Sequence, residues 1–249
     1  MKKILFSITL VTCSILISCG DPEPTAAEIM DLSIQAHGAD LAANARMDFI
    51  FRGINYSVDR YDGQFAYERR FRQGDMDVLD RLDNNGFTRH FNDSLVVLND
   101  TIAQRYQSSV NSVIYFAQLP YGLDGDAVNL KLIGTDSIMD SNYYEIQVTF
   151  KEEGGGEDHE DVFVYWIDTQ DYLIDYMAYS YCEDDCGFRF RESVNRRNLN
   201  GITVQDYNNY KSNRQDPKLE DLDDAFEAGK LQLLSEIKTE FPDVKLHNK

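Results

Sequence analysis

Apolar and polar residues alternate along most of the chain after Met47, and this period of two is typical of β-strands that bury one face. Short turn sequences such as Asp-Gly, Gln-Gly and Asn-Leu-Asn-Gly separate the alternating runs. In the first half we predict strands over 47–61, 63–72, 75–82, 87–91 and 94–98. In the second half we predict strands over 143–150, 161–167, 171–181, 187–194 and 201–210. Because almost no helix lies between neighbouring runs, the connections favour antiparallel hairpins.

Three other stretches have apolar residues at the spacing of a helix. The first covers residues 26–45 and is interrupted at His37-Gly38. The second covers residues 101–118 and ends before Pro120. The third is expected over residues 217–241, with one apolar side formed by Leu219, Leu222, Phe226, Leu233, Leu234, Ile237 and Phe241.

Together these elements predict an α+β fold, in which a large antiparallel sheet of about nine or ten strands is covered by helices. A twisted sheet of that size usually curls, so we expect a curved sheet, or half-barrel. The sheet domain is expected over residues 29–213 and includes the mid-chain helix. Residues 214–249 are expected to form a C-terminal helix that packs on or beside the sheet.

The first residues predict an export signal. Two lysines precede an apolar run over residues 4–17, which is short for a membrane span but suits a signal peptide over residues 1–18. The sequence Leu-Ile-Ser-Cys at its end resembles the bacterial lipobox, which implies cleavage before Cys19 and attachment of lipid to its sulfur. Residues 19–28 would then be the lipidated N-terminus and a spacer. The alternative is an ordinary signal peptide that leaves no anchor.

The leader and the charge together limit the partners. The leader predicts an outer membrane lipoprotein of the cell envelope that faces the periplasm or the cell surface, held by its acyl chains. Without residues 1–18 the chain keeps 22 basic and 43 acidic side chains, a formal net charge of −21. Such a protein repels phosphate backbones and anionic headgroups, which argues against nucleic acid as a partner. The charge does not identify a protein partner.

Two cysteines remain outside the leader, and they flank a predicted hairpin turn. Cys182 and Cys186 enclose the sequence Glu-Asp-Asp, with a glycine directly after the second cysteine. A hairpin brings such a pair within disulfide range, and an oxidising envelope compartment favours the bond. The same pair could ligate a metal, although two further ligands are not evident nearby.

Three charged residues fall on the apolar side of predicted strands. Arg69 alternates with aromatic residues, while Asp80 and Glu192 alternate with apolar ones. Because charges seldom stay buried without a partner, we expect Arg69 to pair with Asp80 or with Glu192. In a cavity these side chains would bind the polar headgroup of a ligand. The alternative is that they lie near strand ends, where the alternation breaks and the charges reach water.

Aromatic residues are the other candidate lining of a cavity. The chain has 15 tyrosines, 14 phenylalanines and one tryptophan, and many of them lie in the strands of the second half. We select Tyr165, Trp166 and Tyr179 as ligand-binding candidates. Aromatic strands also commonly form core or pair across a sheet, and that interpretation stays open.

The acidic turn after residue 151 contains three weak metal candidates. Asp158, His159 and Asp161 follow a run of three glycines, and carboxylate and imidazole groups are metal ligands. The glycines do not lead into a helix, as a phosphate-binding loop would, and acidic hairpin tips are commonly solvated. The four histidines form no known nucleophile–base or HExxH pattern. We therefore assign no catalytic residue and expect no cofactor.

Several phrases of the sequence resemble a known family. They lie at residues 36–40, 109–123, 148–167, 172–181 and 188–210. They are similar to envelope lipoproteins of Bacteroidota that are grouped as a domain of unknown function. The order of elements also resembles LolA and LolB, in which an unclosed barrel covered by helices encloses an apolar cavity for acyl chains.

This resemblance implies a lipid-anchored envelope protein that binds a lipid or another apolar ligand within a curved sheet. Two alternatives stay open from the sequence. The protein could be a structural or interaction lipoprotein with a filled core, or a hydrolase that works at the acidic turn.

Overall fold

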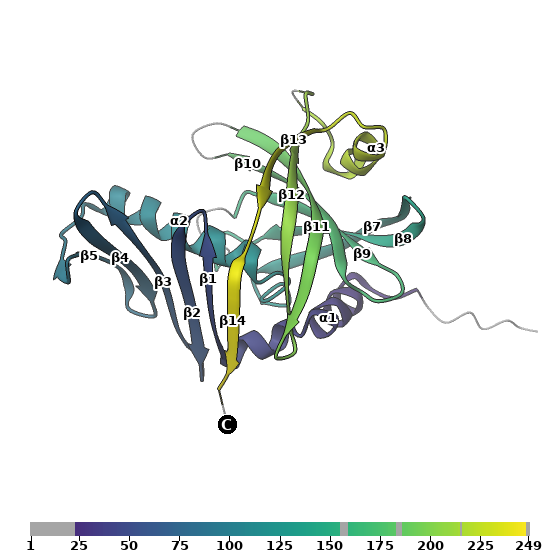
Figure 1. Ribbon diagram of the computed structural model, residues 1–249. Coiled ribbons are helices and arrows are strands. Elements are labelled where there is room, and N and C mark those ends of the chain that lie inside the picture. Colours follow the sequence, from purple (N-terminus) through teal and green to yellow (C-terminus); the bar gives the residue numbers. More distant parts are fainter. Residues whose placement is uncertain (1–22, 155–158, 183–185, 215, 248–249) are drawn as a thin grey trace, which may run out of the picture.

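The computed structural model describes residues 23–154, 159–182, 186–214 and 216–247, and its strands form two antiparallel sheets (Figure 1). The predicted signal peptide and Cys19 lie outside the described residues. The predicted α+β fold with antiparallel sheets and few helices is confirmed. The described chain forms two seven-stranded sheets, where the sequence predicts one sheet of about nine or ten strands.

The first sheet has the order β14-β1-β2-β3-β4-β5-β6. Neighbouring strands from β1 to β6 are joined by tight turns and pair in sequence order, as the alternating pattern predicts. One predicted strand, 47–61, is a hairpin with a turn at Arg52-Gly53. The strands are β1 (Ala45–Phe51), β2 (Ile54–Tyr61), β3 (Gln64–Gln73), β4 (Met76–Asp83), β5 (Gly86–Phe91), β6 (Ser94–Leu95) and β14 (Glu240–Leu246).

The second sheet has the order β13-β12-β11-β10-β9-β8-β7. Its strand β7 was not predicted, because Gly134 and a polar stretch after it hide the alternation. The hairpin of β10 and β11 pairs Cys182 with Cys186, and the predicted disulfide between them is confirmed. The strands are β7 (Val128–Ile138), β8 (Ser141–Phe150), β9 (Val162–Asp168), β10 (Ile174–Cys182), β11 (Cys186–Leu199), β12 (Ile202–Lys211) and β13 (Gln232–Ile237).

The C-terminal tail joins the two sheets. Its strand β13 pairs with β12 and the next strand, β14, pairs with β1, so the two lie end to end between the sheets (Figure 1). The predicted helix over 217–241 is therefore wrong for most of its length. Only η2 (Leu219–Asp221) and α3 (Leu222–Glu227) are helical, and Gly229 in a left-handed conformation follows them. Backbone pairing with two open sheet edges outweighs the helical spacing of the later leucines.

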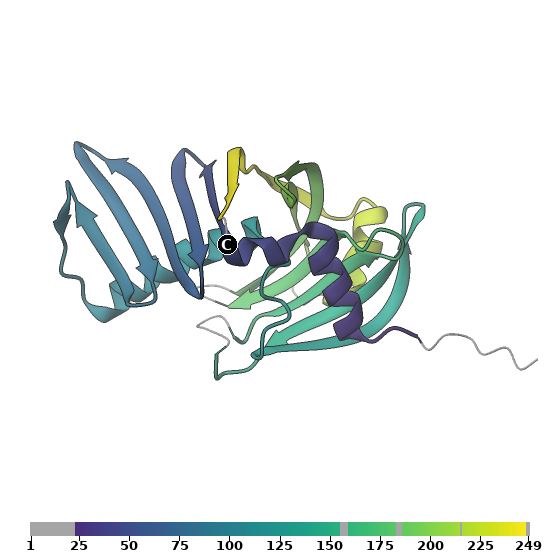
Figure 2. The same ribbon diagram turned by 90° about the horizontal axis from the view of Figure 1, so that it is seen from below.

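Two longer helices cover the sheets. The first, α1 (Ala26–His37), begins at a capping box of Thr25 and Glu28 and continues into η1 (Ala39–Asn44) after Gly38. The second, α2 (Asp100–Ala117), begins at Asn99, whose side chain accepts a hydrogen bond from the N–H of Ile102. Figures 1 and 2 show α2 crossing β3, β4 and β5 and continuing toward the second sheet. Both helices match the sequence prediction.

The second sheet buries residues on both of its faces. Phe163, Tyr165 and Tyr179 belong to a core on the side of α1 and α2. Val164, Trp166 and Phe190 belong to a separate core beneath η2 and α3. Since successive side chains of a strand point to opposite faces, the long apolar run of β9 supplies both cores. Because of this two-sided burial, predicted site residues on opposite faces of the sheet cannot contact each other.

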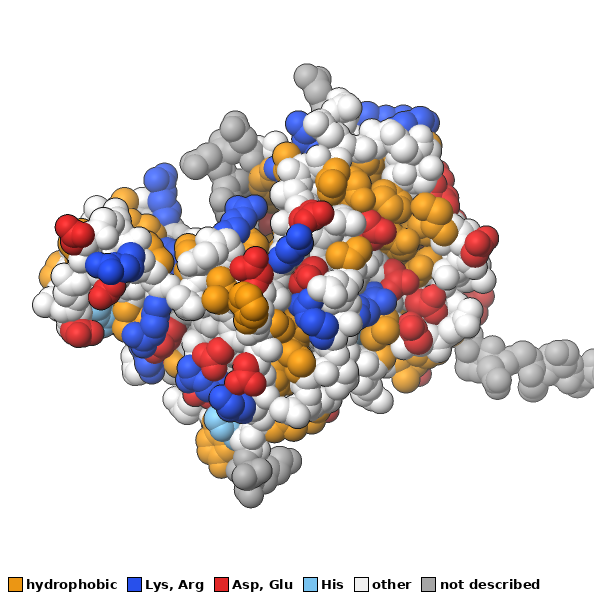
Figure 3. All heavy atoms as spheres, in the orientation of Figure 1, with side chains coloured by type: hydrophobic (Ala, Val, Ile, Leu, Met, Phe, Trp, Pro, Cys, Tyr) orange, Lys and Arg blue, Asp and Glu red, His pale blue; other side chains and the backbone are white. Residues whose placement is uncertain are grey.

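The surface in Figure 3 mixes basic, acidic and apolar side chains, and no single sign of charge dominates this face. Among the described residues, no helix is both long enough and apolar enough to cross a membrane.

Candidate functional site: an aromatic cavity with buried arginines

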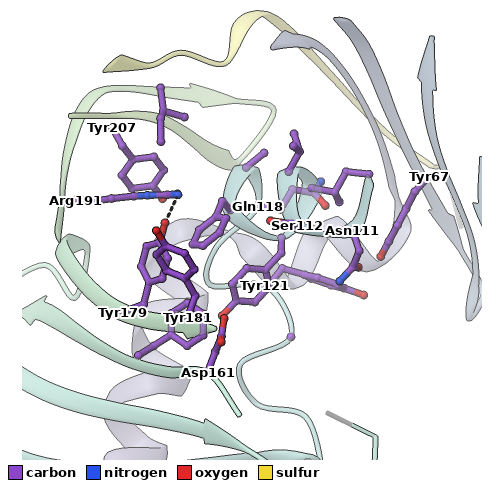
Figure 4. Close-up of a pocket in the computed structure, with 18 of the residues that line it drawn as sticks. Tyr67, Asn111, Ser112, Gln118, Tyr121, Asp161, Tyr179, Tyr181, Arg191 and Tyr207 are labelled. Carbon is purple, nitrogen blue, oxygen red and sulfur yellow. Dashed lines mark hydrogen bonds between the residues drawn. The ribbon is translucent and has the colours of Figure 1, made fainter. Parts of the chain in front are cut away.

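A cavity of about 850 Å³ lies between the two sheets. The C-terminal half of α2 and the segment that follows it form one wall, and strands of both sheets form the others (Figure 4). A volume of this size is within the range of small-molecule binding sites. The cavity forms because α2 bridges the sheets and cannot fill the space between them.

Aromatic rings form much of the cavity wall. Tyr179 lies at the centre of this group, with its ring centroid 5.2 Å from that of Phe116 and 5.4 Å from that of Phe163. Tyr67 and Tyr121 face the same space from β3 and from the segment after α2 (Figure 4). These rings present apolar faces and hydroxyl groups together, a combination that suits a ligand with an apolar body and a polar group.

Arg191 on β11 is the most unusual charge in the wall. Its side chain is only 7% exposed, and its Nη2 donates a hydrogen bond of 2.6 Å to the hydroxyl of Tyr179. The guanidinium carbon lies 3.8 Å from the ring centroid of Phe116. Nε and Nη1 have no hydrogen-bond acceptor among the described residues. Cation–π contacts offset part of the cost of burying this charge, but they leave two N–H donors unsatisfied.

A second buried arginine, Arg60 on β2, lines the cavity from the first sheet. It is 6% exposed and donates from Nη1 to Oε1 of Gln118 at 2.5 Å. Its Nη2 donates to the hydroxyl of Tyr67 at 2.6 Å, and the ring centroid of Tyr121 lies 4.1 Å from its guanidinium carbon. All of these partners are neutral. The two arginines therefore bring positive charge to the cavity, whose lining also includes the carboxylates of Asp126 and Asp161.

One of the predicted ligand-binding residues, Tyr179, lines this cavity. A second, Tyr165, does not line it, but its hydroxyl lies 2.9 Å from that of Tyr115, which does. Burial raises the pKa of both Tyr115 and Tyr165 well above the ordinary value. Both hydroxyls therefore stay protonated, and the pair acts as a neutral hydrogen-bonded support for the wall.

Arg69 and Asp80 lie elsewhere, between the first sheet and the N-terminal half of α2. The predicted pair forms, with Nε of Arg69 2.6 Å from Oδ2 of Asp80. Arg89 on β5 joins it, with its Nε 2.5 Å from Oδ1 of Asp80. Arg69 also donates to Ser109 of α2 at 2.7 Å, and Arg89 lies over the ring of Tyr106. Neither Arg69 nor Asp80 lines the cavity, and their binding role remains a prediction.

Trp166 and Glu192 point to the other face of the second sheet. Trp166 is fully buried in the core beneath α3. Glu192 is half-buried and accepts hydrogen bonds from Asn208 at 2.9 Å and from the hydroxyl of Tyr210 at 3.1 Å. They therefore do not meet Tyr179 or Arg69, although the sequence grouped them together.

The weak metal candidates in the acidic turn remain a prediction. Asp158 lies outside the described residues, and Asp161 lines the cavity. Among the described residues, a different group of acids could hold a metal: Asp136, Glu145 and Asp223. Burial, together with the neighbouring carboxylates, raises the pKa of Glu145 to about 7 and that of Asp223 to about 6.

Arg60, Gln118 and Arg191 line the cavity, although the sequence pattern does not predict them as site residues. Arg191 follows Phe190, and the alternation that places Phe190 inside places Arg191 on the opposite face. That inference assumes a single buried face, and β11 has two. Aromatic residues at both odd and even positions of neighbouring strands were the signal that could have shown this.

Two antiparallel sheets and a bridging helix thus surround an aromatic cavity. The chain belongs to a family of unknown function, DUF6503, whose model matches residues 2–239. The predicted membership in a family of unknown function is thus confirmed. No curated protein matches the chain.

Several solved structures are similar to the chain at low sequence identity. A LolA superfamily protein from Nitrosomonas europaea is 10% identical, with 91% of this chain and 95% of that chain covered and a TM-score of 0.47. A DUF1329 family protein from Desulfovibrio piger is 12% identical, with 74% and 85% covered and a TM-score of 0.40. Lipoprotein LppX from Mycobacterium tuberculosis is 15% identical, with 61% and 87% covered and a TM-score of 0.27.

Proposed function

We propose that this protein binds a lipid or another apolar ligand in the cavity between its sheets, and that the ligand carries an anionic group. The observation that carries the proposal is the aromatic cavity of about 850 Å³ with Arg191 buried in its wall. A structural protein with a filled core would not need such a space. The cavity therefore favours the binding function over the structural one.

The apolar part of the ligand is inferred from the rings. Phe116, Phe163 and Tyr179 form a continuous aromatic surface against which acyl or ring carbons could pack. Removing such carbons from water stabilises the complex by about 25 cal/mol per Å² of apolar area. A chain of apolar carbons is the simplest occupant for this wall.

The anionic part is inferred from the arginines. A buried guanidinium without a counter-charge is unfavourable, and Arg191 keeps two donors without acceptors. A carboxylate or phosphate group on the ligand would supply both the charge and the acceptors. Arg60 adds a second positive charge to the same cavity.

The envelope location and the lipid anchor are also part of the proposal. Both are supported by the signal-like residues 1–18 and by Cys19 in its lipobox-like context. Anchoring through Cys19 would keep the cavity close to a membrane, which is a source of anionic amphiphiles.

A dye-displacement experiment tests this function. The neutral apolar dye N-phenylnaphthylamine is expected to bind the purified protein, and hexadecanoate and hexadecanol are then used to displace it. Ser112→Trp places a large ring in the cavity, toward which Ser112 points (Figure 4), and should weaken dye binding at least about tenfold. Gln104→Trp changes an exposed residue of the same helix outside the cavity and is the matched control.

The same experiment tests the anionic group. The parent protein should bind hexadecanoate about tenfold more tightly than hexadecanol, because a hydrogen bond to a charged group contributes about 1.5–3 kcal/mol. Arg191→Gln should remove that preference, whereas Arg189→Gln at the more exposed edge of the cavity should retain most of it. If the dye, hexadecanoate and hexadecanol all fail to bind, the proposed function is wrong. Equal binding of acid and alcohol would leave an apolar site and remove its anionic part.

A further inference from the structure

Three carboxylates converge outside the cavity, at the opposite face of the second sheet. They are Asp136 on β7, Glu145 on β8 and Asp223 on α3, and an oxygen atom of each lies within 4.8 Å of the other two. The three residues are far apart in the sequence. The pairing of β7 with β8 and the packing of α3 on β7 bring them together.

This group differs from an ordinary acidic surface. Glu145 is 9% exposed and Asp223 is 2% exposed, and Asp136 alone is open to solvent. Oδ1 of Asp223 is buried and has no hydrogen-bond partner among the described residues. After burial itself, the carboxylates of Asp223, Asp136 and Glu220 raise the pKa of Glu145, and those of Asp136 and Asp224 raise the pKa of Asp223. Like charges in a low-dielectric site repel strongly unless a cation lies between them.

The backbone leaves room for the carboxylate of Glu145. Strand β7 changes register between Leu132 and Gly134, and Gly134 faces Glu145 across the pair. A Cβ atom at Gly134 would lie 2.7 Å from Oε2 of Glu145. The glycine therefore permits the close approach that places this carboxylate beside the other two.

We propose that Asp136, Glu145 and Asp223 bind a divalent cation of the Ca²⁺ class. The donor atoms are carboxylate oxygens only, which suit hard cations such as Ca²⁺ better than zinc. Oxygen atoms within 4.8 Å of one another can all contact one ion at the 2.3–2.6 Å distances that Ca²⁺ prefers. The exposed Asp136 provides the route of entry.

The cation would attach α3 to the sheet. Asp223 belongs to α3, whereas Asp136 and Glu145 belong to β7 and β8, so one ion would join α3 to two strands of the sheet beside the core around Trp166. This site is independent of the cavity ligand, because none of the three residues lines the cavity. The cation is therefore expected to change stability and to leave dye binding unchanged.

Trp166 allows a direct measurement. It is the single tryptophan of the chain and the register partner of Glu145. Tb³⁺ bound at the three carboxylates should therefore luminesce when Trp166 is excited, and Ca²⁺ should displace it. In chelator-treated protein, Ca²⁺ should raise the melting temperature, with a dissociation constant of about 0.1–1 mM, as for extracellular calcium sites.

Three variants probe the same ion in different ways. Glu145→Gln and Asp223→Asn each remove one ligand charge and should weaken Tb³⁺ and Ca²⁺ binding at least about tenfold. Gly134→Ala retains every charge, displaces the Glu145 carboxylate, and should weaken binding as well. Glu240→Gln removes an exposed carboxylate of β14 and should bind like the parent.

The three carboxylates could instead share protons. In that case Ca²⁺ would not raise the melting temperature of the parent, and Tb³⁺ would give no Trp-sensitised signal; either result overturns the proposal. Equal Ca²⁺ effects in the parent and in Glu145→Gln would also overturn it. Glu145→Gln is expected to fold without added metal, because it removes a buried negative charge.

Discussion

The buried arginines of this protein fall into two kinds, which differ in the side chains that they bind. Arg69 and Arg89 share Asp80, which is fully buried, and they hold α2 on the first sheet. Arg60 and Arg191 bind neutral groups at a cavity. The first kind is paired with a carboxylate within the fold, and the second lies in the cavity wall, where we propose that it binds a ligand. A buried charge is thus interpretable only when its partners are known.

Asp80→Asn tests the structural kind. The change leaves two buried guanidinium groups without a counter-charge, so the free energy of unfolding should fall by about 3 kcal/mol. Urea denaturation monitored by circular dichroism measures this loss. Asp77→Asn on the same strand breaks an exposed pair with Arg72, at 3.4 Å, and should cost less than about 1 kcal/mol. Equal losses in the two variants would refute the structural role of Asp80.

At the scale of elements, the end of α1 is set by its contact with the β11–β12 turn. Gly38 has a φ of 61°, and a Cβ atom there would lie 2.0 Å from the carbonyl oxygen of Gly201. His37 precedes it, is 1% exposed, and its Nδ1 lies 2.9 Å from the carbonyl oxygen of Ser33. Only a glycine permits this close crossing, which places His37 inside the protein.

The buried His37 predicts a dependence of stability on pH. Burial lowers its pKa to about 4; the hydrogen bond to Ser33 and the charge of Asp175 act to raise the pKa, and the charge of Arg196 acts to lower it. The unfolded chain binds a proton near pH 6.5 and the folded chain only near pH 4. The His37 contribution to stability is therefore complete above about pH 6.5 and lost as the pH falls through about 4, a total of roughly 3 kcal/mol.

Comparison with His37→Gln isolates this effect. The variant has no titrating ring, so the parent should lose roughly 3 kcal/mol relative to it between pH 7 and pH 4. Urea denaturation at several pH values gives the difference. Asp77→Asn, which retains His37, should follow the parent. A constant difference between parent and His37→Gln across this range would show that His37 is not buried as a neutral ring.

At the scale of the whole molecule, the tail holds the two sheets together. Between β13 and β14 the backbone N–H of Thr239 donates to Oδ1 of Asp206 at 2.9 Å. Arg197 binds Asp206 at 2.8 Å and also donates to the carbonyl oxygen of Thr239 at 3.1 Å. The chain thus crosses from one sheet to the other at a point that side chains of β11 and β12 hold in place.

Asp206→Asn should loosen this crossing. The variant loses an ion pair with Arg197 and weakens the bond to Thr239, so the backbone amides of both β13 and β14 should exchange about tenfold faster. Hydrogen exchange with mass spectrometry measures it. Asp243→Asn, which removes an exposed partner of Lys245 on β14, should leave exchange nearly unchanged. Faster exchange in β14 alone would contradict the inference that Asp206 holds both β13 and β14 in place.

Most of the local elements and hairpins are predictable from the sequence. The alternation of β2 to β5 and of β8 to β12, the two longer helices, and the Cys182–Cys186 disulfide all follow from residues close together in the chain. The pairing of Arg69 with Asp80 was also predictable, because the two residues lie opposite each other on neighbouring strands. The spacing of residues along the chain is sufficient to predict a contact wherever both partners belong to one hairpin.

The assembly of these hairpins depends instead on contacts between residues far apart in the sequence. The tail forms strands because the open edges of β1 and β12 pair with it. The sequence of the tail alone does not indicate that these edges are available. Likewise, Arg191 faces the cavity because α2 and α1 cover one face of the second sheet while α3 covers the other. Alternation tells which residues share a face, but the elements packed against each face decide whether it becomes core, cavity or solvent.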